Sequence, residues 1–160
     1  MSTIDHYINA VLERGTAEAR ADGSATIDAH HLLLGIAAEQ GAAGHAVLAE
    51  AGLDRAAIRA ALDREFEHSL SAVGVSPAAF GLPRPSPDPE RRPGVGASAR
   101  LALERGFAHA ARKRDLRPAH LLLGLLEAEV GTVPRALALA GVDREELAGR
   151  AREAAAQEDW

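Results

Sequence analysis

The sequence predicts an all-α fold built from two similar halves, and one repeated phrase carries most of this prediction. DAHHLLLGIAAEQG at residues 28–41 returns as RPAHLLLGLLEAEVG at residues 117–131. The matching histidines are His31 and His120, so the offset between the halves is 120 − 31 = 89 residues. The match continues without a gap well beyond this phrase. Self-similarity at a fixed period indicates a duplicated structural unit.

Composition favours one globular domain with an aliphatic core. Of the 160 residues, 47% are apolar and only 3% are aromatic, and a chain of this length can bury a sizeable core. The absence of cysteine excludes disulfides, thiol catalysis and thiolate-bound zinc. The net charge of −5 argues against nucleic acid as a partner. Because no segment resembles a signal peptide or a membrane span, we expect a cytoplasmic protein without a membrane partner.

Apolar spacing predicts four helices in the first half. The first covers residues 3–21. The second is the repeated phrase, which is apolar on nearly every side and therefore central and buried, with Asp28 as its N-cap. A short third helix at residues 43–51 ends at Gly52, which suits a left-handed stop. The fourth helix follows, and its buried stripe is predicted to hold Ile58, Ala61, Leu62 and Phe66.

The second half repeats this plan with small differences. LERG at Leu12–Gly15 matches LERG at Leu103–Gly106, an offset of 103 − 12 = 91 residues. Since 91 − 89 = 2, the first half has two extra residues before its central helix. Arg117 stands at the cap of the second central helix but has no side-chain oxygen, so we expect Asp115 to act instead. Gly141 is expected to end the third helix.

The duplication predicts one domain, residues 1–160, made of two tandem four-helix repeats at 1–70 and 97–160. The connector, residues 71–96, holds six of the eight prolines, whose alternation forbids a helix and favours an extended linker. Each repeat has about half the core that it needs, so the two should pack together with pseudo-twofold symmetry. Gly35 and Gly124 occupy the same place in the two central helices. A helical glycine costs about 1 kcal/mol relative to alanine, and here it should let another helix approach closely.

These residues resemble the N-terminal domain of Clp-type AAA+ unfoldases (the ClpA and ClpC type), in which a Clp-N repeat occurs twice. The resemblance rests on H-L-L-L-G-[IL] at His31–Ile36 and His120–Leu125, followed by VLAEAGLD at Val47–Asp54 and ALALAGVD at Ala136–Asp143. It implies a non-enzymatic module that docks protein substrates, adaptors or small cyclic peptides and modulates Clp-dependent proteolysis. Lys113, the only lysine, belongs to no Walker A loop. We therefore expect a stand-alone binding module without a motor or a cofactor, with a ClpC-type unfoldase or its substrates as partner.

The resemblance places ligand contacts at the starts of the first and second helices of each repeat. By position, these residues are Ile4, Asp5, His30, Val95, Arg117 and Ala119. Family members that recognise phosphoarginine carry Thr-Glu before the repeat histidine. Ala29-His30 and Pro118-Ala119 stand there in this chain, which argues against phosphoarginine as the ligand. The shared motif is expected to be structural, with each histidine bonding locally under a neighbouring helix; it comprises His31, Gly35, Gly52, His120, Gly124 and Gly141.

The histidines and serines also raise the alternatives of a metal site and of hydrolytic catalysis. A metal site would use the histidines, but His30 and His31 are adjacent and should point about 100° apart on a helix, so no metal is predicted. Hydrolysis needs a nucleophile with a base in reach, whereas the serines fall in loops, the linker and helix ends. We therefore do not expect an enzyme. A decoy that sequesters small peptides or antibiotics and a purely structural interaction domain stand as the alternatives.

A basic cluster precedes the second central helix and consists of Arg112, Lys113, Arg114 and Arg117. One interpretation is the solvated C-terminal end of a helix, where cations interact favourably with the helix dipole. The other is a surface for an acidic partner. Nucleic acid is not expected there, because no aromatic residue interleaves the basic ones.

Overall fold

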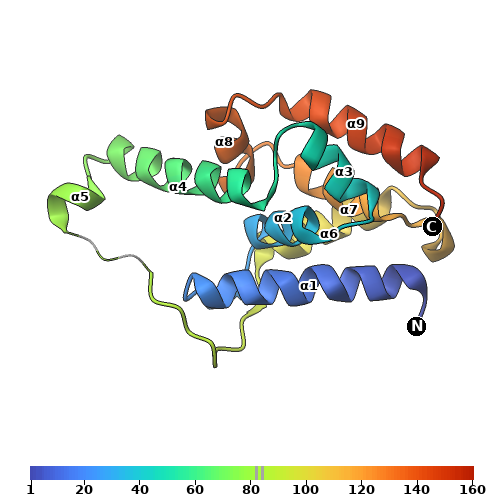
Figure 1. The fold of residues 1–160 in the computed structure, drawn as a ribbon, viewed down its shortest axis with the longest axis horizontal. Helices are drawn as coiled ribbons and strands as arrows, with labels where there is room; N and C mark the ends of the chain where they lie inside the picture. Colours follow the sequence, from blue (N-terminus) through green and yellow to red (C-terminus); the bar gives the residue numbers. More distant parts are fainter. Residues whose placement is uncertain (82, 84) are drawn as a thin grey trace.

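The computed structural model describes residues 1–81, 83 and 85–160, and it confirms the all-α tandem-repeat fold (Figure 1). The helices of the first repeat are α1 (Thr3–Ala21), α2 (Ala29–Ala38), α3 (Ala43–Glu50) and α4 (Arg55–Ala72). Those of the second are α6 (Ala97–Ala108), α7 (Pro118–Leu126), α8 (Thr132–Leu139) and α9 (Arg144–Gln157). The smaller elements are β1 (Thr26–Ile27), α5 (Pro77–Phe80), β2 (Gly94–Val95) and the 3-10 turn η1 (Lys113–Asp115).

The two central helices, α2 and α7, form the core as predicted. Leu34 in α2 and Leu122 and Leu126 in α7 have no exposed surface, and in Figure 1 both helices lie between α1 and α9. Within the described residues, no single helix is long and apolar enough to span a membrane. The pair α2 and α3 meets that test of length and composition only when joined across a 94° bend.

Paired glycines let the first and second helices of each repeat cross in close contact. A Cβ atom on Gly35 would lie 2.8 Å from the carbonyl oxygen of Val11 in α1. A Cβ atom on Gly124 would overlap the backbone of α6 at Ala102 and Gly106. Gly106 in turn faces the carbonyl oxygen of His120, which a Cβ atom would approach to 2.8 Å. The duplicated glycines are therefore the points where the helix backbones touch.

The two repeats interlock through their third and fourth helices. Helix α4 of the first repeat packs mainly against α8 of the second, and α9 of the second packs against α3 as well as α7. The guanidinium of Arg135 in α8 donates to the carboxylate of Glu65 in α4 over 2.9 Å. Neither repeat therefore completes its core alone, and the two form one domain in space.

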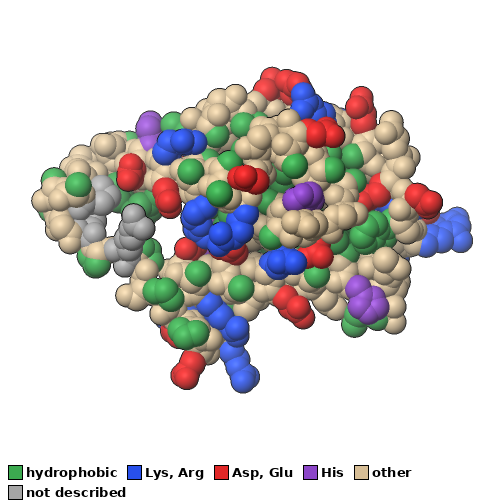
Figure 2. Space-filling model, in the orientation of Figure 1, with side chains coloured by type: hydrophobic (Ala, Val, Ile, Leu, Met, Phe, Trp, Pro, Cys, Tyr) green, Lys and Arg blue, Asp and Glu red, His purple; other side chains and the backbone are tan. Residues whose placement is uncertain are grey.

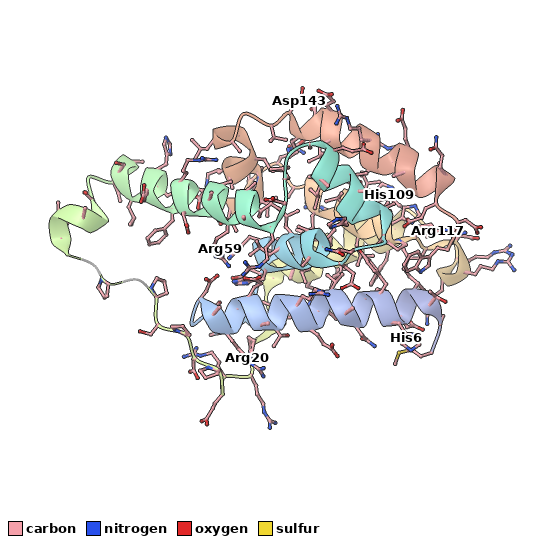
Figure 3. All side chains as sticks on the ribbon, viewed as in Figure 1. His6, Arg20, Arg59, His109, Arg117 and Asp143 are labelled. Atoms are coloured by element: carbon pink, nitrogen blue, oxygen red, sulfur yellow. The ribbon has the colours of Figure 1, made fainter. Side chains whose placement is uncertain are left out.

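The connector departs from the sequence prediction. Helix α4 runs past residue 70 to Ala72, and a one-turn helix, α5, forms before the alternating prolines. The connector then returns to the first repeat. The backbone N–H of Asp88 donates to the carbonyl oxygen of Arg20, and the Arg20 side chain (Figure 3) donates to the carbonyl oxygen of Arg91. Because β2 then pairs in parallel with β1, the second half of the connector lies against the first repeat.

Two details of the sequence prediction are wrong. Phe66 was placed on the buried stripe of α4 but is 55% exposed, whereas Glu65 is buried. The Glu65 carboxylate is accommodated there because Arg135 and the hydroxyl of Ser69 both donate to it. Asp115 does not cap α7; it lies in η1 and is exposed. The cap of α7 instead depends on His120, as described below.

We expect Gly124→Ala to destabilise the protein by about 1–3 kcal/mol, because the new methyl group overpacks the α6–α7 crossing. The loss should appear although alanine is by itself about 1 kcal/mol better than glycine in a helix. Gly149→Ala in α9 is the matched control. Nothing lies within 4 Å of its added Cβ, so it should be neutral or stabilising. Urea denaturation of both variants tests this, and a Gly124→Ala protein as stable as Gly149→Ala would contradict it.

Candidate functional site

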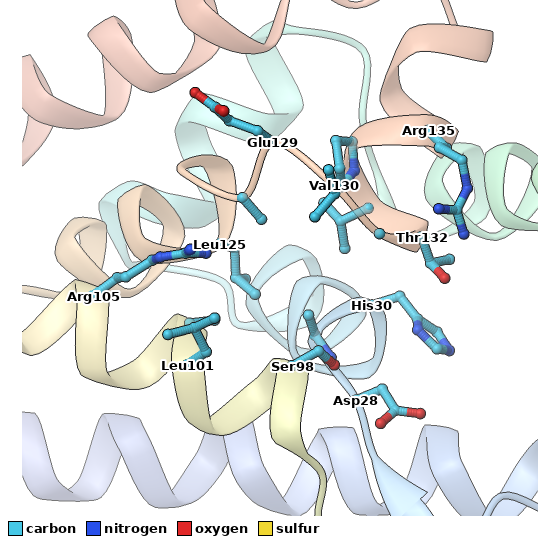
Figure 4. A pocket seen from close by; sticks show the side chains of 16 residues that line it. Asp28, His30, Ser98, Leu101, Arg105, Leu125, Glu129, Val130, Thr132 and Arg135 are labelled. Carbon is cyan, nitrogen blue, oxygen red and sulfur yellow. The ribbon is translucent and has the colours of Figure 1, made fainter.

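A cavity of about 280 Å³ lies between the two repeats, and we call it the inter-repeat cavity (Figure 4). Its walls come from the start of α2, from α6 and from the loop between α7 and α8. In Figure 4, Leu101, Leu125 and Val130 surround its centre, with His30 and Arg135 on one side. Val130 is 86% exposed and Leu101 is 44% exposed. The cavity is thus an apolar recess with polar groups at its edge.

A second cavity of about 690 Å³, the N-terminal cavity, lies where α1 begins. Its walls are the first turn of α1, residues 113–117 and Trp160. Figure 3 shows Arg117 at the end of the molecule where the two chain termini lie. The two cavities lie at different places relative to the pseudo-symmetry, because only Asp28 and Arg117 occupy equivalent positions in their walls.

The structure places four of the six sequence-predicted site residues in the walls of these cavities. Ile4, Asp5 and Arg117 line the N-terminal cavity together, and His30 lines the inter-repeat cavity. Val95 is 39% exposed in β2 and lines neither cavity. Ala119 is fully buried, so its side chain is not available to a ligand.

Each repeat histidine acts as part of a helix cap. The Nδ1 atom of His31 accepts the backbone N–H of Asp28 over 2.9 Å, and that of His120 accepts the backbone N–H of Arg117 over the same distance. Imidazole thus takes the place that the N3 carboxylate has in a capping box, and the backbone N–H groups of both histidines bond the N-cap carbonyl oxygens instead of an N-cap side chain. His31 is 1% exposed, and its role is local and structural.

The capping bond of His31 also bears on whether Asp22, His30 and His31 could bind a metal ion. Asp22, His30 and His31 bring one potential ligand atom each within 4.8 Å of one another, so the expected divergence of the two histidines does not keep them apart. However, Nδ1 of His31 accepts a backbone N–H, which leaves the ring proton on Nε2. That nitrogen therefore donates to Asp22, 3.0 Å away, and has no lone pair for a metal ion. The cluster fits hydrogen bonding rather than metal coordination.

His30 is a neutral group at the edge of the inter-repeat cavity. Burial lowers its pKa to about 4, and the neighbouring His31 acts in the same direction. Asp22 and Asp28 oppose this effect but do not overcome it. At neutral pH the cavity therefore has an uncharged imidazole that can donate one hydrogen bond and accept another.

The C-terminal segment supplies site residues that sequence reasoning missed. The two carboxylate oxygens of Glu158 accept the backbone N–H groups of Ala43 (2.9 Å) and Ala119 (3.2 Å), which start α3 and α7. Trp160 meets the ring of Tyr7 edge-on, with ring centroids 5.7 Å apart. No sequence pattern indicated these contacts, since Glu158 lies 115 residues from Ala43 along the chain. One carboxylate thus bridges helix starts of both repeats.

The chain is similar to known proteins in sequence and in fold. A family model described as the Clp repeat N-terminal domain matches residues 4–86, just over half of the chain. No curated protein matches the chain significantly. A solved structure described as "Preliminary structural investigations of a malarial protein secretion system" superposes with a TM-score of 0.61. It is 18% identical, over 96% of this chain and 94% of that one, and at this identity the likeness concerns the fold alone.

The depressed pKa of His30 predicts a loss of stability in mild acid. Between pH 6.5 and 4 the unfolded chain takes up a proton on His30 that the folded protein does not, so stability falls as the pH drops through this range. We expect a loss of about 1–3 kcal/mol. His30→Asn should flatten this part of the profile, and His68→Asn at an exposed position controls for the substitution. An NMR-measured pKa of His30 near 6.5 would contradict the prediction.

Removal of the Glu158 carboxylate should weaken two helix starts at once. We expect Glu158→Ala to cost about 1–2 kcal/mol, because the N–H groups of Ala43 and Ala119 lose their acceptor. Glu153→Ala, at an exposed position on α9, is the control and should change stability by less than about 0.5 kcal/mol. Thermal and urea unfolding measure both, and equal stabilities of the two variants would count against the bridging role.

Proposed function

The chain belongs to the family of Clp repeat N-terminal domains, and from this we propose that it is a non-enzymatic binding module for other polypeptides. The ligand is an apolar segment that docks in the inter-repeat cavity. The observation that carries this proposal is the apolar recess itself, bordered by side chains that stay exposed in the free protein. Ligand sites are typically concave and mainly apolar, with a few polar groups that fix orientation.

The walls of the cavity explain what kind of segment it would take. Val130 and Leu101 expose apolar surface around the recess, and covering such surface contributes about 25 cal/mol per Å². The loop that carries Val130 and the helix that carries Leu101 belong to the second repeat, whereas His30 belongs to the first. A segment with one or two aliphatic side chains can therefore fill the recess while touching both repeats.

Polar groups at the edge can hold the backbone of such a segment. The neutral imidazole of His30 can donate to a carbonyl oxygen or accept an N–H. Among the described contacts, no acceptor is found for the backbone N–H of His30 in the first turn of α2, so it is open to a ligand carbonyl. Two basic residues, Arg105 and Arg135, and two acidic ones, Asp28 and Glu129, also line the cavity, so polar groups of either charge on the segment can find a partner at its edge.

Catalysis is not part of the proposal, because the polar groups are not arranged for it. The Ser98 hydroxyl lines the cavity, but its oxygen accepts the backbone N–H of Ala29 over 3.0 Å. No hydrogen bond joins Ser98 to His30 among the described contacts, so the serine lacks an activating base.

We further propose that a Clp-type unfoldase is the protein that receives the bound segment, with the cytoplasm as their common compartment. Family membership supports this choice. Acidic and basic side chains are interspersed over the face that Figure 2 shows. The proposal therefore does not require an interface between two large surfaces of opposite charge. Sequestration of ligands from the unfoldase is the competing outcome, and a competition assay with the purified unfoldase separates the two.

Binding of fluorescein-labelled casein, an unfolded polypeptide, tests the docking proposal by fluorescence anisotropy. We expect saturable binding that Val130→Asp weakens about tenfold, because burial of a valine side chain is worth about 1.5–3 kcal/mol. Val73→Asp is the matched control, since Val73 is 74% exposed at the end of α4 and lies outside both cavities. The absence of saturable binding, or equal effects of the two variants, would overturn the proposal.

A further inference from the structure

One arginine occurs at the same place in both repeats but has a carboxylate partner in only one of them. In the first repeat, the Arg14 guanidinium in α1 donates to the carboxylate of Glu39, the C-cap of α2, over 2.5 Å. The LERG match makes Arg105 in α6 the counterpart of Arg14. At the offset of 89 residues, the counterpart of Glu39 is Ala128. The second repeat therefore keeps the arginine but has alanine where its carboxylate partner would be.

The neighbouring acidic residues of the second repeat do not replace that carboxylate. Glu127, the C-cap of α7, pairs with His109. Glu129 is exposed, and in Figure 4 its carboxylate points away from the recess. Among the described residues, none forms a hydrogen bond or an ion pair with the side chain of Arg105, which is half-buried. Arg105 is therefore a cation that has lost part of its hydration without gaining a partner.

This arginine faces the inter-repeat cavity. Arg105 and Ala128 both line the cavity, and in Figure 4 the Arg105 side chain extends from α6 toward Leu125. Alanine takes up less space than glutamate at this point of the wall. A carboxylate from another molecule can therefore reach Arg105 and form the charge-assisted hydrogen bonds that the first repeat forms internally.

The other charged groups of the wall are engaged within the chain. Asp28 accepts the hydroxyl of Thr26 over 3.0 Å, and Arg135 donates to the α4 carboxylate described above. Helix α8 begins at the cavity with Thr132, whose backbone N–H has no acceptor among the described residues. The positive end of the α8 dipole therefore adds to the attraction that Arg105 exerts on an anion.

We propose that the inter-repeat cavity binds the C-terminal end of a partner polypeptide. The terminal carboxylate pairs with Arg105, and an aliphatic last side chain packs against Leu101 and Val130. This inference rests on the proposed docking function, because it uses the same cavity, and it names the part of the polypeptide that the cavity recognises.

The spacing of the wall residues favours a chain end over an internal segment. Leu101 and Arg105 are one turn apart on α6, a separation of about 5–6 Å between Cβ atoms. A C-terminal residue carries its carboxylate and its side chain on one Cα, so it can reach both. In an extended internal segment, successive side chains point to opposite faces, so an acidic and an aliphatic side chain on the same face are at least two residues apart.

The size of the cavity agrees with this occupant. Its volume of about 280 Å³ lies at the lower end of the range for ligand pockets, about 300–1,000 Å³, which suits a terminal residue better than a segment that passes through. His30 lies on the opposite side of the recess from Arg105 in Figure 4. Its open backbone N–H can donate to a carbonyl oxygen ahead of the last residue.

The test uses the full chain and three fluorescein-labelled peptides, with binding measured by fluorescence anisotropy. The first is Gly-Ser-Gly-Ala-Val-Leu with a free terminal carboxylate, and the second is the same peptide as its C-terminal amide. The third, Gly-Ser-Gly-Ala-Glu-Leu amide, carries its carboxylate on a side chain. We expect saturable binding of the first and affinities at least tenfold lower for both amides. Equal affinity of the acid for either amide, or no binding of the acid, would overturn the proposal.

Variants of the arginine locate the carboxylate. Arg105→Gln should weaken the acid peptide at least tenfold and leave the amide unchanged, because the amide has no charge to lose. Arg100→Gln, at an exposed position on the same helix outside the cavity, is the matched control and should bind the acid peptide like the parent protein. Equal effects of the two variants would contradict the assignment of Arg105.

A carboxylate restored to the wall should compete with the ligand. Ala128→Glu gives the second repeat the acidic residue that the first has at Glu39, and it should weaken the acid peptide at least tenfold. Ala138→Glu, at an exposed position on α8, adds the same charge outside the cavity and should not. Equal affinities of these two variants for the acid peptide would refute the inferred carboxylate position.

The docking proposal and this inference fail separately. Casein binding that Val130→Asp weakens, together with equal affinities for the acid and amide peptides, would refute chain-end recognition and leave docking intact. Binding of the acid peptide without binding of casein would support chain-end recognition and overturn the wider docking proposal. Absence of binding by casein and by all three peptides would overturn both.

Discussion

Backbone contact between the first and second helix of each repeat is the constraint on which the rest of the structure depends. Gly35 meets α1 at Val11, and Gly124 meets α6 at Ala102 and Gly106. A side chain at these positions would push the first helix of each repeat away from the second. The leucines of the central helices would then be less shielded from solvent. The same contact fixes where α2 and α7 begin relative to the opposite repeat, and both cavities lie at those beginnings.

The elements of the fold were predictable because their signals are local. The offset between the repeats, the apolar phrase and Gly52 and Gly141, whose φ angles are +73° and +74°, all act within a few residues. The exposed Phe66 and buried Glu65 were not predictable, because their positions depend on Arg135, 70 residues away. The candidate site follows the same rule: Ile4, Asp5 and Arg117 were expected by position and line one cavity, whereas Glu158 and Trp160 come near Arg117 only through tertiary contacts.

Duplication gave two equivalent places, and a few substitutions made them chemically different. At the cap of the central helix, Asp28 stands in one repeat and Arg117 in the other. Before the first helix, Ser2 and Asp5 start α1 early, whereas Pro93 and the neighbouring glycines keep the equivalent segment extended as β2. The chain itself therefore pairs with residues 25–27 ahead of α2, whereas the Arg117 side chain bonds the carbonyl oxygens of Arg114 and Leu116 ahead of α7. The two repeats thus keep the same helices but carry different residues at the starts of their first and second helices.

The histidine caps link this chemistry to the stability of the domain. An aspartate or glutamate at the positions of His31 and His120 would cap equally well but would place a negative charge at each helix start. Imidazole accepts the same N–H without a charge, and burial lowers the pKa of the His120 cap. In the first repeat the carboxylate of the N-cap Asp28 stands at the positive end of the α2 dipole, whereas the N-cap Arg117 leaves the positive end of the α7 dipole to another acidic group. In the second repeat, the Glu158 carboxylate uses that potential at Ala119, which ties the C-terminal segment to the wall of the cavity where Arg117 lies.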